Sequence, residues 1–212
     1  MTMYLTFSLN EVEVTAKKAA RGSGFTWGMA EEAGKATRWL CGKGVNGCAE
    51  LSRLLSIAER NIERTPILEA GIWKSVASSL CPISVGACMA DQAHELDAQG
   101  WQVNDVACPA FLMPFAAEIA AKTGQTVDVT GQEFTAVTDG IHLNLTGQLP
   151  VHGVPVTIRT SQKTLRPSDA FSRAAPTETD WTVLQTLAHR TYAPATEASR
   201  AKGAGAGMTD ND

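Results

Sequence analysis

The spacing of apolar residues changes at Gly124, and this change limits the chain to folds that join helices to an antiparallel sheet. Before Gly124, apolar residues recur mostly at intervals of three and four, as on one face of a helix. Between positions 127 and 158 they alternate with polar residues, as in strands with one buried face. The pattern predicts an α+β fold, in which a helical N-terminal half packs with a small antiparallel β-meander and C-terminal helices.

Three helices are predicted in the first third of the chain. Ser8 and Glu11 have the spacing of a capping box, so a helix should begin there and end near Gly22, which is free to take a left-handed backbone. A second helix, over 28–41, has a narrow face of small residues that lets another helix approach closely. The third, over 47–61, has the clearest amphipathic pattern. Together they predict a helical hairpin or small bundle.

The middle and end of the chain give clear signals only after position 110. Residues 72–90 are apolar and fit a buried strand or a buried helix, so the secondary structure of 72–108 stays open. A helix is predicted over 111–122, with Pro114 in its first turn, then four strands with a hairpin at Asp139-Gly140, and helices over 181–191 and 194–202. The strand residues expected to face the core are Val127, Val129, Ile141, Leu143, Leu145, Val156 and Ile158.

No long linker divides the chain, so we expect a single α+β domain over residues 1–202 and a Gly-rich tail over 203–212. The 18 Lys and Arg are scattered and the net charge is -4, which argues against nucleic acid as a partner. The first ten residues have neither a basic leader nor a long apolar stretch, and no later segment resembles a membrane span. We therefore expect a cytoplasmic protein with no membrane association.

The cysteines and histidines predict neither a disulfide nor a metal site. The five Cys are odd in number and form no Cys-x-x-Cys, and the four His lack the spacing of metal ligands. Cys81-Pro82 and Cys108-Pro109 would matter if a thiolate attacked a substrate, but buried packing is the favoured interpretation. We expect no cofactor.

Two long motifs, one near each end of the chain, carry a resemblance to a known family. Residues 21–34, which read Arg-Gly-Ser-Gly-Phe-Thr-Trp-Gly-Met-Ala-Glu-Glu-Ala-Gly, and residues 191–207, which end in Gly-Ala-Gly-Ala-Gly, resemble the signatures of a bacterial family named domain of unknown function 3726. The resemblance implies no activity, cofactor or catalytic residue.

The glycine-rich turn over 22–28 opens a helix, where backbone N–H groups can bind an anion. Glu31 and Glu32 follow in the first turn and would repel phosphate, so a tight structural turn is favoured over a ligand loop. Glu31 also precedes Lys35 by four residues, which is typical of a solvated charged face.

We place the candidate site where the two glycine-rich segments meet, because chain termini of compact domains are often close in space. In this hypothesis Arg21 and Arg200 bind a carboxylate, and Glu31 or Glu197 acts as acid or base. The predicted ligand-binding residues are Arg21, Ser23, Trp27, Tyr192, Ser199 and Arg200.

Two functions fit these residues. The preferred one is binding or transforming a small anionic metabolite, with the choice between binder and enzyme left open. The alternative is a non-catalytic accessory protein that presents the small-residue helix face and the tail to a protein partner or a second copy. A pocket shared by the two glycine-rich segments would distinguish them.

Overall fold

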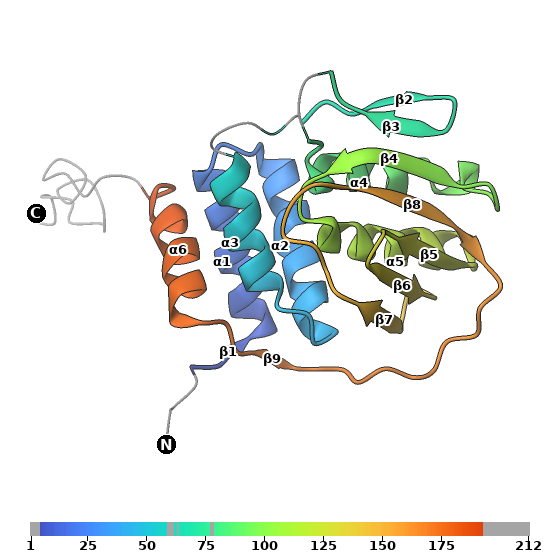
Figure 1. Cartoon of the computed structure of the whole chain (residues 1–212). Helices are drawn as coiled ribbons and strands as arrows, with labels where there is room; N and C mark the ends of the chain where they lie inside the picture. The colour runs from blue at the N-terminus through green and yellow to red at the C-terminus, as the bar shows by residue number, and fades with distance from the viewer. Residues whose placement is uncertain (1–4, 59–61, 63, 77–78, 193–212) are drawn as a thin grey trace, which may run out of the picture.

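A helical bundle stands beside a sheet that carries helices on one face (Figure 1). The computed structural model describes residues 5–58, 62, 64–76 and 79–192. One continuous cluster of buried apolar residues runs through both parts. The fold is α+β, as predicted.

The first helix, α1 (Leu9–Gly22), begins with the predicted capping box. The Ser8 hydroxyl accepts the N–H of Glu11 at 3.2 Å, and the Glu11 carboxylate accepts the N–H of Ser8 at 2.8 Å. The helix ends at Gly22 as predicted, but the left-handed backbone expected there occurs at Gly24, with φ of 88°. Gly22 stays inside the helix, where its missing Cβ makes room for another helix.

The bundle is completed by α2 (Trp27–Gly42), α3 (Gly47–Ala58) and α6 (Glu178–His189). The small residues of α2 are buried as predicted, and a Cβ added at Gly34 would lie 2.9 Å from the carbonyl oxygen of Glu13. Backbone contact of this kind explains why a stripe of small residues was needed. The predicted third helix ran to 61, but 59–61 lie outside the described residues, as do the predicted helix 194–202 and the tail 203–212.

Seven strands form the main sheet in the order β2-β3-β4-β8-β5-β6-β7. Their bounds are β2 (Ile67–Glu69), β3 (Ile72–Lys74), β4 (Trp101–Val106), β5 (Thr126–Thr130), β6 (Phe134–Thr138), β7 (Leu143–Gly147) and β8 (Val154–Ser161). Neighbours run antiparallel except β3 and β4. The helices α4 (Pro82–Asp91) and α5 (Leu112–Thr123) pack together behind it (Figure 1).

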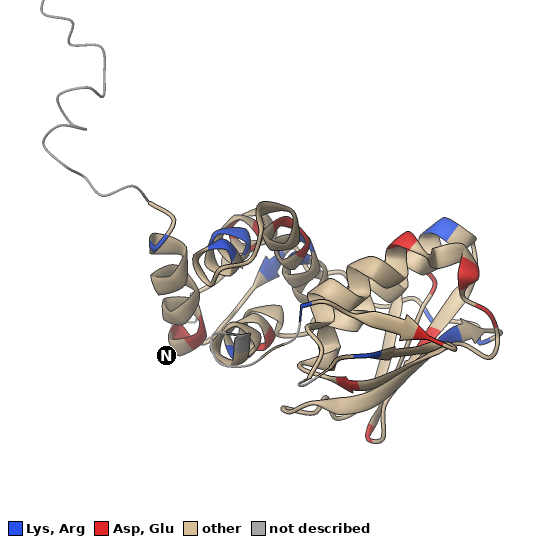
Figure 2. Cartoon of the chain, turned by 90° about the horizontal axis from the view of Figure 1, so that it is seen from above, with Lys and Arg blue, Asp and Glu red and all other residues tan. Residues whose placement is uncertain are grey.

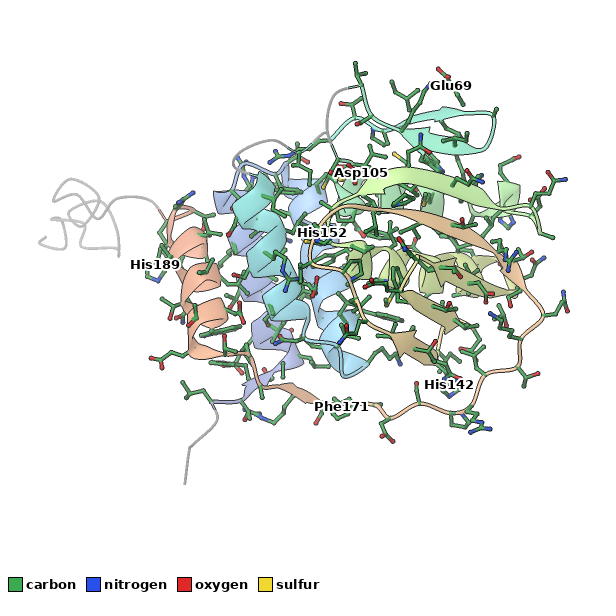
Figure 3. The ribbon with its side chains drawn as sticks, viewed as in Figure 1. Glu69, Asp105, His142, His152, Phe171 and His189 are labelled. Atoms are coloured by element: carbon green, nitrogen blue, oxygen red, sulfur yellow. The ribbon has the colours of Figure 1, made fainter. Side chains whose placement is uncertain are left out.

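Short elements connect these parts. A two-stranded sheet pairs β1 (Phe7–Ser8) with β9 (Arg173–Ala174) below the bundle, and the 3-10 helices η1 (Ala93–Glu95) and η2 (Pro109–Phe111) precede β4 and α5. Residues 162–172, here called the strap, join β8 to β9 along the lower edge of the sheet (Figure 3, where Phe171 is labelled). Within the described residues, none of the helices is both long and apolar enough to cross a membrane.

The four predicted strands are present, but they do not form one meander. Strands β5, β6 and β7 do, with Asp139-Gly140 in the β6–β7 turn. Strand β8 instead returns to lie between β4 and β5. Strand β4, with which β8 pairs, falls in the region whose secondary structure the sequence left open. The central place of β8 in the sheet could therefore not be predicted. The same region holds β3 and α4.

One predicted core residue is exposed. The side chain of Ile141 is 70% exposed, whereas Val127, Val129, Leu143, Val156 and Ile158 are buried and Leu145 is half-buried. The Asp139 carboxylate accepts the N–H groups of Ile141 at 2.9 Å and of His142 at 2.6 Å. These bonds hold Ile141 in the turn, two residues before β7 begins at Leu143.

Candidate functional site

In the turn between α1 and α2, backbone N–H groups donate to carbonyl oxygens at the end of α1. The N–H of Ser23 donates to Ala19, that of Gly24 to Arg21 at 3.0 Å, and that of Phe25 to Ala20 at 3.1 Å. A loop that binds phosphate needs N–H groups that point outward. The turn therefore has the structural role that the sequence favoured.

The carbonyl groups of the same turn accept hydrogen bonds from two arginines. Arg21 donates to the carbonyl oxygen of Phe25 at 2.9 Å, and Arg64 donates to that of Gly24 at 3.0 Å. Each guanidinium also lies over an aromatic ring, Arg21 over Trp27 at 5.2 Å from the ring centroid and Arg64 over Phe25 at 4.3 Å. Both cations are thus held in fixed positions by a carbonyl and a ring.

The C-terminal end of α6 lies beside this turn. Gly22 packs against the backbone of Leu187, and Lys18 of α1 donates to the hydroxyl of Tyr192 at 3.3 Å while lying 5.0 Å from its ring centroid. Tyr192 also packs edge-on against His189, which Figure 3 labels on α6. Lys18 and Arg21 are three residues apart, so they are neighbours on the surface of α1.

These contacts bring residues near the start of the sequence together with residues near its end, up to Tyr192, the last residue that the structure describes. We call the resulting area the bundle-end surface; Figure 2 looks down on it. It consists of Lys18, Arg21, Trp27, Arg64 and Tyr192, with the buried ring of Phe25 beneath Arg64. Three of the predicted site residues, Glu197, Ser199 and Arg200, lie outside the described residues.

Two further predicted site residues lie in or beside the turn. The hydroxyl oxygen of Ser23 is buried and has no hydrogen-bond partner among the described residues. The ring of Trp27 is 58% exposed, and a Cβ added at the adjacent Gly28 would meet nothing within 4 Å. Neither the exposed ring nor the glycine beside it is required by packing.

Glu31 does not join the bundle-end surface. Its carboxylate pairs with Lys17 at 3.1 Å and with Lys35 at 3.7 Å, while Glu32 pairs with Lys35 at 2.9 Å. The hydrogen bond from Lys17 is the main reason that the pKa of Glu31 is lowered. Lys17 points about 100° away from Lys18 around α1, so Glu31 belongs to the charged face that the sequence favoured.

Sequence reasoning missed Arg64 and Lys18. Arg64 follows α3 in a stretch without helical or alternating periodicity, and it lies 40 residues from Gly24 along the chain. Lys18 is one of several basic residues on α1, and what distinguishes it is its contact with Tyr192, which follows α6. No local pattern could have identified either residue.

The cysteines are all free, and four of the five are buried. Burial raises the pKa of the Cys81 thiol, and it raises that of Cys108 to about 12. Both thiols are therefore protonated packing groups, as the sequence favoured. Among the residues that the structure describes, no three His, Cys, Asp or Glu side chains cluster closely enough to hold a metal ion.

A comparison with known families agrees with the resemblance seen in the motifs. Residues 7–87, which cover α1, α2, α3 and the start of the sheet part, match the family described as protein of unknown function (DUF3726). No curated protein and no solved structure matches the chain.

Proposed function

We propose that this chain, whose residues 7–87 match the family of unknown function 3726, binds a small anionic molecule at the bundle-end surface. The observation that carries the proposal is the set of three cation–ring pairs at one end of the bundle: Lys18 with Tyr192, Arg21 with Trp27, and Arg64 with Phe25. Cations held in this way lose little side-chain entropy when an anion binds.

The chemistry of these groups favours a carboxylate or a phosphate. A guanidinium has five N–H donors, and the carbonyl of Phe25 or Gly24 accepts from only part of that set. The remaining donors suit the paired oxygens of a carboxylate or phosphate. The exposed ring of Trp27 offers an apolar surface beside them, so we propose an anion that carries a flat apolar group.

Binding is favoured over catalysis by the described residues. Of the two predicted acid or base residues, Glu31 is described, and it pairs with Lys17 on another face of α1, where the hydrogen bond from Lys17 lowers its pKa. Glu197, the other candidate, lies outside the described residues. We propose a binding protein of a bacterial cytoplasm, with no nucleic acid as partner; five free thiols support a reducing compartment.

The alternative, an accessory protein, has less support. Its proposed surface included the small-residue face of α2, but Ala30, Ala33 and Gly34 are buried against the chain's own bundle. A protein partner or a second copy would have to bind elsewhere.

The proposal is tested with the full chain and three probes, which are benzoate, inorganic phosphate and uncharged benzamide. Calorimetry should detect benzoate or phosphate but not benzamide, and Arg21→Gln or Arg64→Gln should weaken binding about tenfold or more. Arg38→Gln is the matched control, because Arg38 pairs with Glu13 at 2.7 Å on the α1–α2 surface and is not one of the bundle-end residues. Equal binding by all variants, or no binding of either anion, would refute the proposal.

A further inference from the structure

Asp128 is a buried acid in the middle of a strand. It lies in β5 between Val127 and Val129, which point into the core, so its side chain points to the opposite face of the sheet. Only 2% of Asp128 is exposed. Within the described part of the chain, its Oδ2 accepts from Lys163 of the strap at 2.8 Å, and its Oδ1 is buried without a hydrogen-bond partner.

This placement is unfavourable for folding alone. Asp is depleted in strands because it does not pack well on a pleated surface. A buried carboxylate oxygen without a donor lowers stability further, because its lost hydration is not replaced by a hydrogen bond. Residues that break local rules in this way are concentrated at functional sites.

Asp128 also lines a shallow, open cavity of ≈ 410 Å³ whose lining includes two basic residues. Arg159 of β8 is directly opposite Asp128 in the strand register, and Lys163 of the strap also lines the cavity. The volume is within the range of about 300–1,000 Å³ that is usual for small-molecule sites. A second cavity of ≈ 470 Å³ shares Ser161, Gln162 and Lys163 with the first, so the strap borders both.

The strap is anchored on β7, which lies two strands from β5 in the sheet. Asn144 of β7 exchanges two hydrogen bonds with the backbone of Arg166, at 3.0 and 3.1 Å, and the hydroxyl of Ser168 accepts the N–H of Leu143. Lys163 itself is held less firmly, because its side chain is 54% exposed and has one acidic partner. Its ammonium is therefore the group that a ligand can displace from Asp128.

We propose that this cavity binds a free amino acid in its zwitterionic form. Once Lys163 has moved aside, the ammonium of the ligand donates to Oδ2 in its place and extends a second N–H to the neighbouring Oδ1, which lacks a donor. The carboxylate of the ligand accepts from Arg159 and from the displaced ammonium of Lys163. One acid and two bases match a zwitterion, whereas a simple anion would leave Oδ1 unpaired. The site shares no residue with the bundle-end surface and is independent of the proposed function.

The test uses the full chain, the standard amino acids, and two analogues of alanine that each lack one charged group. Propionate has no ammonium, and ethylamine has no carboxylate. At least one amino acid should bind by calorimetry or by chemical-shift perturbation, and neither analogue should bind comparably. Asp128→Asn and Arg159→Gln should each weaken amino-acid binding by about tenfold or more, because each removes one charge-assisted contact.

The matched control is Asp91→Asn, since Asp91 is exposed at the end of α4. Arg159 is exposed, so Arg159→Gln tests the site even if Asp128→Asn fails to fold. Absence of binding by every amino acid at about 10 mM would overturn the proposal, a concentration well above the usual small-ligand Kd. Binding that is unchanged in Arg159→Gln and in a folded Asp128→Asn would also overturn it.

Discussion

Gly22 of α1 lies directly against the carbonyl oxygen of Leu187 in α6, and a Cβ added at Gly22 would lie 1.9 Å from that oxygen. The contact joins the first helix of the chain to the last described one. It also sets the distance between Lys18 and Tyr192, which belong to the same pair of helix ends.

Gly22→Ala should therefore separate α6 from α1. Backbone cannot move aside as a flexible side chain can, so we expect a loss of about 1–3 kcal/mol in the free energy of unfolding. Urea denaturation measures this loss. The fluorescence or NMR signal of Tyr192 should change as well, because its contact with Lys18 depends on the same packing.

Gly28→Ala is the matched control for that substitution. A Cβ at Gly28 would meet nothing within 4 Å, and Gly28 has no left-handed backbone. Alanine in the first turn of α2 should leave stability unchanged or raise it by up to about 1 kcal/mol. A destabilised Gly28→Ala would mean that the turn is packed differently.

The β6–β7 turn should lose stability in acid. Burial raises the pKa of Asp139, but hydrogen bonds from the backbone and ring of His142 and from the N–H of Ile141 outweigh it and lower this pKa to about 2. Because the folded pKa is below the unfolded value of 3.8, Asp139 stabilises the fold above about pH 4. The contribution is lost as the pH falls toward 2.

Asp139→Ala should show a smaller fall in unfolding free energy between pH 4 and pH 2 than the unmodified chain. Chemical denaturation at several pH values measures the difference, which should be modest because the Asp139 side chain is 35% exposed. Parallel pH profiles for the two proteins would contradict the assignment.

The thiols should react in a defined order. Cys88 is the one cysteine that is half-buried, whereas Cys41, Cys48, Cys81 and Cys108 are buried. Iodoacetamide at neutral pH should modify Cys88 first in the folded protein, and all five thiols after denaturation. Fast modification of Cys108 in the folded state would show that its pKa is not raised by burial.

The sequence predicted elements whose determinants are local. The capping box of Ser8 and Glu11 depends on contacts within four residues, and the αL residue Gly124 ends α5 in the same way, with φ of 69°. Strand order is different, because the position of β8 depends on β4, which lies about 50 residues earlier in an unassigned region. Local spacing carries no information about such a pairing.

The candidate site likewise combines residues that local sequence could predict with residues that it could not. Arg21 and Trp27 belong to one turn and were predicted together. Arg64 reaches that turn from beyond α3, and Asp128 appeared only as the polar partner in an alternating strand. Its hydrogen-bond partner Lys163 lies 35 residues away, and a sequence pattern cannot reveal such a pair.

Arg64 should hold the turn between α1 and α2 closed. It donates to the carbonyl of Gly24 at 3.0 Å and covers the ring of Phe25, whose side chain is 1% exposed. Arg64→Gln removes the stacked guanidinium and leaves the Gly24 carbonyl to water, at an expected cost of about 1 kcal/mol.

Because the amides of Ser23, Gly24 and Phe25 donate within the turn, their hydrogen exchange reports its opening directly. Exchange at these three amides should become faster in Arg64→Gln while amides in β5 and β6 are unaffected. In Arg38→Gln, which removes an exposed ion pair with Glu13, the turn should exchange at its normal rate. Equal exchange rates in all three proteins would show that Arg64 contacts the turn without stabilising it. Binding the anion would then be the one proposed role left for its charge.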